Sequence, residues 1–523
     1  MASASTGKRQ IVTNGIANGV GFAVAVVVAF YMSPILVHGL GDSRYGIWSL
    51  VESILAYLAL ADFGIGAAVL RFVAKYEGLQ DSKSVNRVFS TSLAMFAAAG
   101  LLVLLATIGL AFFWGHPLGV SDDLVVDTRW LLVLLGVNLA AGLPLGIYGT
   151  VLSGLGRYPA RNAIRVSWLL IRSVMFVIAI RIGGGVPAIA LIITACSLAE
   201  HACTAVAAHR YLPGLRFSVR FIDRETFKSI RGFSMYVFLA LISGRISYQT
   251  DAIVIGVFLA PQNITFFVIA SRLIRYAHEG IRSLIEVLTP AISQWEAMND
   301  YASIGRALIT GTRYVLYMII PVQMGLLVFG YPFLAIWMGP RYADLSYTSL
   351  AILAVPLPLV LVQCVAARVL YGMGKAKAFS ALAATNAGVN LLLSVALVGP
   401  LGIEGVALGT SIPQTIYCLA VFVIVCRAAR VPVQTCLRQS FMKPLVGAAV
   451  LAVVWSIVPR WISPTSWHAL IIVIAAGVAF HGAVVVLFEP RLQQTLSRIW
   501  ALRRTWARTR SPHDEAIATL SDE

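Results

Sequence analysis

Charged side chains recur at helical spacing along one otherwise apolar segment. Arg272, Arg275, Glu279, Arg282 and Glu286 follow one another at intervals of three and four residues. At about 100° per residue they fall within an arc of roughly 80°, so a helix carries all of them on one face. A guanidinium group donates paired hydrogen bonds to phosphate oxygens and keeps its charge when buried. The pattern therefore predicts a helix face that binds a phosphate-bearing anion.

The preceding apolar segment supplies further polar side chains. Arg245, Tyr248 and Gln249 share one face of a helix, and Asp251 lies about 60° from Tyr248. Arg272 lies about 15 Å along its own segment from Pro261, which places it and Arg245 near the middle of their helices. We expect these side chains to contribute to the same anion-binding site.

Two acidic residues, Glu52 and Asp62, lie on another apolar segment, about 80° apart in helical projection. They can bind a coupling cation, or they can pair with the arginines that follow in the sequence. Asp62 can also cap or brace a neighbouring helix. Both functional and structural roles therefore stay open for these carboxylates.

Structural ion pairs are the alternative explanation for the charged residues. Arg245 can pair with Asp251, and Glu279 can pair with the arginines before and after it on the same helix. This pairing leaves Arg272 as the cation with the fewest partners.

The elements that position these residues must be membrane helices. Of the 523 residues, 59% are hydrophobic and 12% are charged, and the mean hydropathy is +0.83. A soluble domain carries about 25% charged residues. This composition excludes a soluble protein, and backbone hydrogen bonding in lipid favours helices.

Apolar stretches of about 20 residues, enough to cross a bilayer, occur fourteen times. The first begins at Ile11 and is too long for a cleavable secretory signal, so we expect it to be retained. The predicted spans have their centres near residues 24, 58, 100, 141, 172, 198, 244, 276, 317, 358, 387, 415, 450 and 476.

Basic residues have a strong bias toward one side of this topology. Of the forty Lys and Arg, thirty lie at the termini or on alternate loops, and only five lie on the opposite loops. Because basic loops stay in the cytoplasm, we expect both termini to be cytoplasmic. The bias accounts for most of the net charge of +17 without a nucleic-acid partner.

An internal repeat indicates two similar halves. VLSGLGR at 151–157 and VLYGMGK at 369–375 are 218 residues apart, which equals six spans, and the same offset places Gly184 on Gly402. Six spans preserve orientation, so the repeat is parallel, as in many transporters that rock two lobes around a central cavity. We predict an all-α polytopic membrane protein with 14 transmembrane helices. Its predicted parts are an N-lobe at 1–215, a C-lobe at 216–430, spans 13 and 14 at 431–488, and a basic cytoplasmic tail at 489–523.

Three further motifs lie in the first lobe: GLGDSRYGIW at 39–48, LADFGIG at 60–66 and RFVA at 71–74. With the repeated turn they make residues 10–430 resemble the polysaccharide transporter family, which includes O-antigen flippases. That family belongs to the multidrug/oligosaccharidyl-lipid/polysaccharide exporter superfamily. The resemblance implies two six-helix bundles around a cationic cavity lined by spans one, two, seven and eight. It also implies transport of an undecaprenyl-diphosphate-linked oligosaccharide from the inner to the outer leaflet.

This resemblance implies a flippase in the bacterial inner membrane, with a polysaccharide polymerase and assembly proteins as possible partners. An oligosaccharide or exopolysaccharide repeat unit is the expected substrate; a multidrug exporter of the same superfamily and a lipid II flippase are the alternatives. A membrane glycosyltransferase fits less well, because the longest external loop, at 114–128, is short. The chain has no nucleotide-binding loop and no metal-binding cysteine pattern, so we expect no cofactor. Coupling to H+ or Na+, or the membrane potential, is left as the energy source for transport.

Spans 13 and 14 lie outside the repeat. The resemblance to lipid II flippases suggests that they wall an apolar path for the polyprenyl tail; the alternative is that they only anchor the fold or mediate dimerisation. The basic segment at 491–510 is either an amphipathic helix on anionic lipid or a solvated tail.

Overall fold

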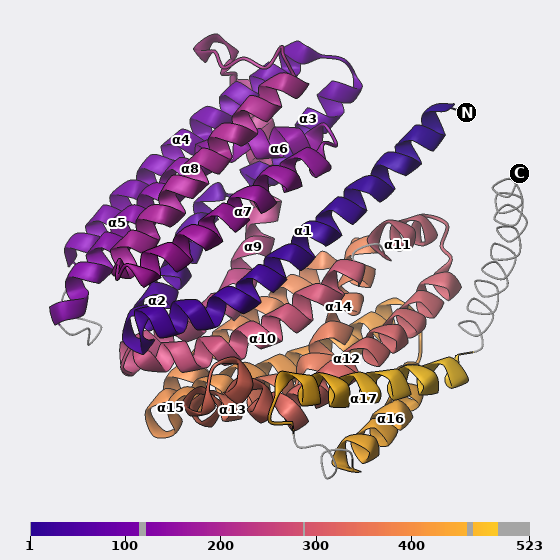
Figure 1. Ribbon diagram of the computed structural model, residues 1–523. Helices are drawn as coiled ribbons and strands as arrows, with labels where there is room; N and C mark the ends of the chain where they lie inside the picture. Colours follow the sequence, from indigo (N-terminus) through magenta and orange to yellow (C-terminus); the bar gives the residue numbers. More distant parts are fainter. Residues whose placement is uncertain (1, 114–121, 286–287, 458–463, 490–523) are drawn as a thin grey trace, which may run out of the picture. The chain divides into compact units, whose positions relative to one another are not determined.

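The protein is all-helical over the residues that the computed structural model describes, which are 2–113, 122–285, 288–457 and 464–489 (Figure 1). Side chains at 2–12, 16, 122–123, 233, 235–237, 239–248, 283–284, 290 and 376–378 are not described. Glu286 and the basic tail predicted at 489–523, apart from Glu489, also lie outside the described residues. No strand occurs within the described ranges.

The first half of the chain forms ten of the labelled helices and two short 3-10 turns. Their bounds are α1 (Ala2–Leu40), α2 (Asp42–Leu58), η1 (Ala59–Asp62), α3 (Ile65–Gly78), α4 (Ser82–Phe113), α5 (Asp122–Leu145), α6 (Ile147–Gly154), α7 (Tyr158–Arg181), α8 (Gly185–Tyr211), η2 (Val219–Phe221), α9 (Arg224–Phe258) and α10 (Gln262–Ile285).

The second half forms seven further helices. Their bounds are α11 (Leu288–Ala297), α12 (Tyr301–Trp337), α13 (Pro340–Ala354), α14 (Leu357–Gly372), α15 (Ala376–Ala428), α16 (Val433–Ile457) and α17 (Trp467–Phe488).

Two compact units divide the described chain. Unit 1 consists of Met1–Tyr276, Asp344–Leu353 and Ala376–Tyr417, and unit 2 consists of Ala277–Ala343, Ala354–Lys375 and the described part of Cys418–Glu523. In unit 1, α4 packs on α5, α5 on α8, α1 on α7 and α2 on α9. In unit 2, α12 packs on α14, α16 and α17. The lobe boundaries predicted from the repeat stay a prediction.

Nine described helices are long and apolar enough to cross a membrane, or eleven when each of two bent pairs counts as one span. All fourteen predicted span centres fall within helices. Two of them, at 387 and 415, fall within the single element α15. The described part of α9, Gln249–Phe258, is apolar but too short to count as a span, and α10 is not among the nine. The chain is thus a multi-pass membrane protein, and the count of fourteen stays a prediction.

Glycines mark the places where helices break. Between α2 and α3 the chain bends by 44°, with Phe63 at φ 48° and Gly64 at φ 76°. Within α15, Gly402 has φ 60° and ψ −138°, values that glycine adopts without steric cost. The helix therefore doubles back as two halves, and a Cβ at Gly405 or Gly409 would overlap the backbone of the first half.

The repeated turn has the same conformation in both places. Gly156 has φ 69° and Gly374 has φ 68°, and each follows the last turn of a helix, α6 or α14. The next residue in each turn donates its backbone N–H to a carbonyl five residues earlier, at 2.9 Å for Arg157 and 2.8 Å for Lys375. This is the glycine C-cap expected from a V-L-x-G-x-G-basic sequence.

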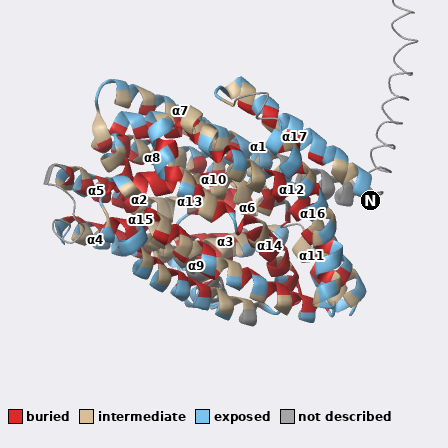
Figure 2. Ribbon diagram, turned by 90° about the horizontal axis from the view of Figure 1, so that it is seen from below, coloured by how far each residue is buried: buried red, intermediate tan, exposed pale blue. Residues whose placement is uncertain are grey.

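Apolar side chains face outward on many helices, as a lipid-facing surface requires. Phe112, Phe113 and Leu487 are each more than 70% exposed. Along α17 exposed and half-buried residues outnumber buried ones (Figure 2). In water this much exposed apolar surface would favour aggregation, whereas in a bilayer it contacts acyl chains.

Carboxylates cap helices on the side predicted to be cytoplasmic. Asp223 accepts the backbone N–H of Thr226 at 2.9 Å at the start of α9, and Asp300 accepts that of Ser303 at 2.9 Å at the start of α12. The backbone N–H of Thr226 lowers the pKa of Asp223, and the Ser303 hydroxyl lowers that of Asp300. Both caps therefore stay ionised and hold the helix starts.

Candidate functional site

The first half of α10 packs closely against the start of α2 within unit 1. A Cβ on Gly46 would overlap the backbone carbonyl of Pro261, so glycine permits the close approach of these two backbone segments. Thr265 of α10 donates its hydroxyl to the carbonyl of Asp42 at 2.7 Å. This close contact brings the side chains one or two turns further along both helices together.

Arg272 lies among the side chains that this contact brings together. Its guanidinium donates to the hydroxyl of the buried Tyr45 and lies 5.3 Å from the centre of that ring. Its Nη2 lies 3.6 Å from the carboxylate of Glu52. Tyr45 and Glu52 are seven residues apart on α2, so two helical turns place both on the face toward α10. The structure thus gives Glu52 one of its two expected roles, that of partner to an arginine.

Arg275 lies one turn further along α10 and is the less constrained cation. It interacts electrostatically with Arg272, Glu52, Tyr276 and Asp251. Within the described residues it makes no hydrogen bond or ion pair. The sequence indicates Arg272 as the arginine with the fewest partners; instead Arg272 is held by α2, and in the described part of the chain Arg275 is the arginine whose donors are not used.

Asp251 of α9 joins a polar network on α15, also within unit 1. The hydroxyl of Thr410 donates to its carboxylate at 3.0 Å, and the amide of Asn390 donates to the Thr410 oxygen at 3.1 Å. A parallel bond joins Asn386 to Gln414 at 3.0 Å. The network therefore joins α9 to both halves of α15. It contains a carboxylate, a hydroxyl and an amide, whose oxygens are the ligands that hard cations prefer.

The neighbouring residues of α9 connect this network to α2. The hydroxyls of Thr250 and Tyr57 form a hydrogen bond, and Gln249 is half-buried. Arg245 and Tyr248 lie on α9, but their side chains are outside the described residues. Their predicted place beside Arg272 therefore stays a prediction.

The second half of α10 belongs to unit 2 and forms a separate group. Arg282 pairs with Glu279 at 3.2 Å, and His278 lies 3.7 Å from the same carboxylate. The other nitrogen of His278 lies 3.5 Å from the sulfur of Cys364 on α14. This chain of contacts gives Arg282 and Glu279 structural partners.

Asp62 lies at the break between α2 and α3 and caps α3. Its carboxylate accepts the backbone N–H of Gly66 at 3.0 Å. The structural role, one of the two left open by the sequence, is the one that this geometry supports.

Sequence reasoning missed the uncharged members of the site: Tyr45, Asn386, Asn390, Thr410 and Gln414. A signal for the last four was present, because Asn386 and Asn390, and likewise Thr410 and Gln414, are polar pairs at i, i+4 spacing on one face of an apolar helix. His278 was missed because a lone histidine beside charged residues carries little information.

Two family sequence profiles match the chain. The profile described as polysaccharide biosynthesis protein matches residues 11–296, and that described as lipid II flippase MurJ matches residues 166–478. The probable low-salt glycan biosynthesis flippase Agl15 of Haloferax volcanii is 23% identical over 384 residues, which are 71% of this chain and 74% of the relative.

Solved structures show the same fold at low sequence identity. The lipid II flippase MurJ in an inward closed conformation has a TM-score of 0.70 at 15% identity, covering 92% of this chain and 99% of that one. An inward-facing multidrug resistance transporter of the MATE family has a TM-score of 0.66 at 15% identity, covering 79% and 94%. Each of the two family profiles covers more than half of this chain. The chain therefore belongs to the polysaccharide biosynthesis protein family, among the flippases and exporters of the multidrug/oligosaccharidyl-lipid/polysaccharide exporter superfamily.

Proposed function

We propose that this protein moves an undecaprenyl-diphosphate-linked oligosaccharide from the cytoplasmic to the outer leaflet by alternating access. The observation that carries the proposal is the pair of arginines on α10. Arg272 is oriented by Tyr45 and Glu52, and Arg275, one turn away, makes no hydrogen bond with any described residue. A diphosphate that leaves water needs such donors, and guanidinium groups supply them in bidentate geometry. Arg245 from α9 would add a third cation.

The same arrangement argues against an exporter of cationic drugs. Such a cargo needs an acidic group that is free to bind it, whereas Glu52 already faces Arg272 at 3.6 Å. A flippase of lipid II type is the second candidate, because the MurJ profile matches residues 166–478. The substrates of both candidate functions contain a polyprenyl diphosphate, and they differ in the group that is attached to it.

Reconstituted vesicles provide the test of function. The purified full chain is expected to move a fluorescent polyprenyl-diphosphate oligosaccharide across the bilayer, as followed by quenching of the label from outside. Empty vesicles and vesicles that contain a heat-denatured sample serve as controls. Movement of a lipid II-type glycopeptide at a higher rate would favour the second candidate. Movement of a cationic dye, with neither lipid transported, would contradict the proposal.

Coupling is proposed to occur at Asp251. Its carboxylate can take up a proton, or it can bind Na+ together with the oxygens of Thr410 and Asn390. Because Asp251 lies on α9 and the other two lie on the two halves of α15, occupancy would tie these elements together. The gradient of either ion across a bacterial inner membrane would then drive the cycle.

Both termini are proposed to be cytoplasmic, with a polysaccharide polymerase receiving the product on the outer side. The bias of thirty basic residues against five supports this orientation. A fluorescent protein that folds only in the cytoplasm is expected to be bright when fused after residue 523, whereas a periplasmic phosphatase at the same place is expected to be inactive. An active phosphatase would refute an even number of spans with an internal N-terminus.

A further inference from the structure

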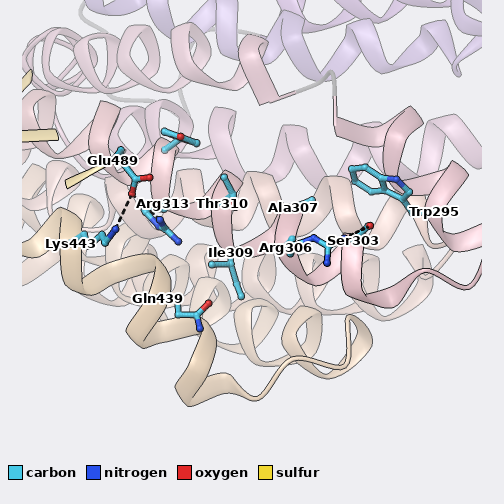
Figure 3. Close-up of a pocket in the computed structure, with 11 residues that line it drawn as sticks. Trp295, Ser303, Arg306, Ala307, Ile309, Thr310, Arg313, Gln439, Lys443 and Glu489 are labelled. Atoms are coloured by element: carbon cyan, nitrogen blue, oxygen red, sulfur yellow. Dashed lines mark hydrogen bonds and ion pairs between the residues drawn. The ribbon is translucent and has the colours of Figure 1, made fainter. Parts of the chain in front are cut away.

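A pocket of about 690 Å³ lies in unit 2 where α12 and α16 begin and α17 ends (Figure 3). These three helix ends are the ones that the charge bias assigns to the cytoplasmic side. The pocket is lined by Trp295, Ser303, Arg306, Ala307, Ile309, Thr310, Arg313, Tyr314, Gln439, Lys443 and Glu489. Its position is that of a headgroup site at the membrane surface.

One end of the pocket contains a buried carboxylate between two cations. Glu489 is 5% exposed, and its carboxylate accepts a hydrogen bond from Arg313 at 2.8 Å. Lys443 lies 3.6 Å from the same carboxylate and donates to the carbonyl of Phe488 at 2.8 Å. The Nε of Arg313 is buried and has no partner among the described residues. This end therefore combines a paired carboxylate with a guanidinium Nε–H that no described residue accepts.

The other end of the pocket contains Arg306. This exposed side chain donates to the hydroxyl of Ser303 at 2.7 Å. The backbone N–H of Ser303 in turn donates to the carboxylate of Asp300 at the start of α12. Figure 3 shows Arg306 and Ser303 beside Trp295, away from the Glu489 cluster. With Asp300 and Glu489 set against the three cations, the region keeps an excess of one positive charge.

An apolar groove of about 670 Å³ adjoins the pocket and shares Tyr314 with it. Its walls are residues 314–333 of α12 and residues 474–485 of α17. The shorter wall, on α17, rises about 17 Å, close to half of a hydrocarbon core about 30 Å thick. Met318, which is 45% exposed, shows that the groove is open, and a Cβ at Gly482 would meet no neighbouring atom.

We propose that the pocket and the groove together bind one anionic glycerophospholipid of the cytoplasmic leaflet, distinct from the transported substrate. Its phosphodiester would lie between Arg306 and the Arg313–Lys443 pair, with an acyl chain along α12 and α17. A single negative charge matches the excess of one positive charge, whereas a diphosphate would bring a second charge toward Glu489. Basic pockets between helices at the cytoplasmic surface are the usual sites for anionic headgroups.

The groove is also the place where the sequence led us to expect a polyprenyl chain, since α17 is the last predicted span. The lipids used in the test must therefore separate the two occupants. Phosphatidylglycerol is the probe for the proposal, phosphatidylcholine with the same acyl chains tests the need for negative charge, and undecaprenyl phosphate tests the polyprenyl alternative.

Native mass spectrometry of the purified full chain is the measurement. Wild-type protein is expected to retain phosphatidylglycerol at least about tenfold more tightly than phosphatidylcholine. The double variant R306Q/K443Q is expected to lose this preference, since charged hydrogen bonds to phosphate are the strong ones. R438Q, which removes an exposed cation of α16 outside the pocket, is the matched control and is expected to bind as wild type. Equal retention of the two phospholipids by wild type would overturn the proposal.

A second pair of variants tests the groove without touching a charge. Gly482→Phe is expected to fill the groove and release phosphatidylglycerol, because the position has open space for a ring. Ala476→Phe adds the same ring on the opposite, exposed side of α17 and is expected to leave binding unchanged. Displacement of phosphatidylglycerol by equimolar undecaprenyl phosphate would assign the site to the polyprenyl chain and refute the proposal. If the protein still transports the oligosaccharide lipid after the phospholipid has been removed, the proposed function holds. The proposed function and the proposed phospholipid site can therefore fail separately.

Discussion

Cells that carry R272A/R275A in place of the wild-type chain are expected to lose surface polysaccharide almost completely, with the protein still inserted and at near-normal abundance. A hydrogen bond to a charged group contributes about 1.5–3 kcal/mol, so the two losses together predict a fall of at least about 100-fold in affinity for the diphosphate. Surface polysaccharide in cells and lipid movement in vesicles are the two readouts. Wild-type polysaccharide from the double variant would remove both arginines from the mechanism.

The two single variants are expected to behave differently, because their surroundings differ. Arg272→Ala removes the hydrogen bond of the buried Tyr45 and the ion pair of Glu52, so it is expected to lower thermal stability as well as transport. Arg275→Ala breaks no hydrogen bond among the described residues and is expected to lower transport alone. Arg181→Ala, which removes an exposed cation from the end of α7, is the control for a change of net charge.

Asp251→Asn is expected to make transport insensitive to an imposed ion gradient. The amide can keep a contact with Thr410 but can neither release a proton nor attract Na+ with a full charge. A tenfold gradient is equivalent to about 1.4 kcal/mol per ion, and the stimulation that it gives the wild type is expected to vanish in the variant. Vesicles with separately imposed pH and sodium gradients give the measurement and identify the ion.

Thr410 provides the matched controls for this experiment. Thr410→Ser keeps the hydroxyl that donates to Asp251 at 3.0 Å and is expected to retain coupling. Thr410→Val removes the hydroxyl at nearly the same volume and is expected to weaken coupling. Undiminished stimulation of Asp251→Asn by both gradients would exclude Asp251 as the coupling group.

Much of the architecture could be predicted because a bilayer imposes strong rules on sequence. Long apolar runs, basic loops on one side and the glycine turn after residues 154 and 372 each have a direct physical reading, and the helix breaks at Gly64 and Gly402 coincide with glycine-containing segments. The limits are visible in α10, which carries three arginines and is not among the nine helices apolar enough to span a membrane.

The site could be predicted only in part. Helical spacing places Arg272 and Arg275 on one face whatever the tertiary structure is. Their partners, by contrast, depend on an approach between α2 and α10 at Gly46, and Tyr45 lies 227 residues from Arg272 in the sequence. No local pattern encodes such a contact, so sequence alone assigned the freer role to the wrong arginine.

The doubled-back helix α15 has a consequence for how the proposed ion binding at Asp251 would produce movement. Gly405 and Gly409 press the second half against the backbone of the first, which leaves no room for one half to slide along the other. Asn390 and Thr410, which lie on the two halves of α15, therefore keep a fixed separation. On the proposal that Asp251 binds the coupling ion, the distance that changes when the ion binds or leaves is the distance between α15 and α9. The movement that couples ion binding to transport would then belong to the helix that carries Asp251.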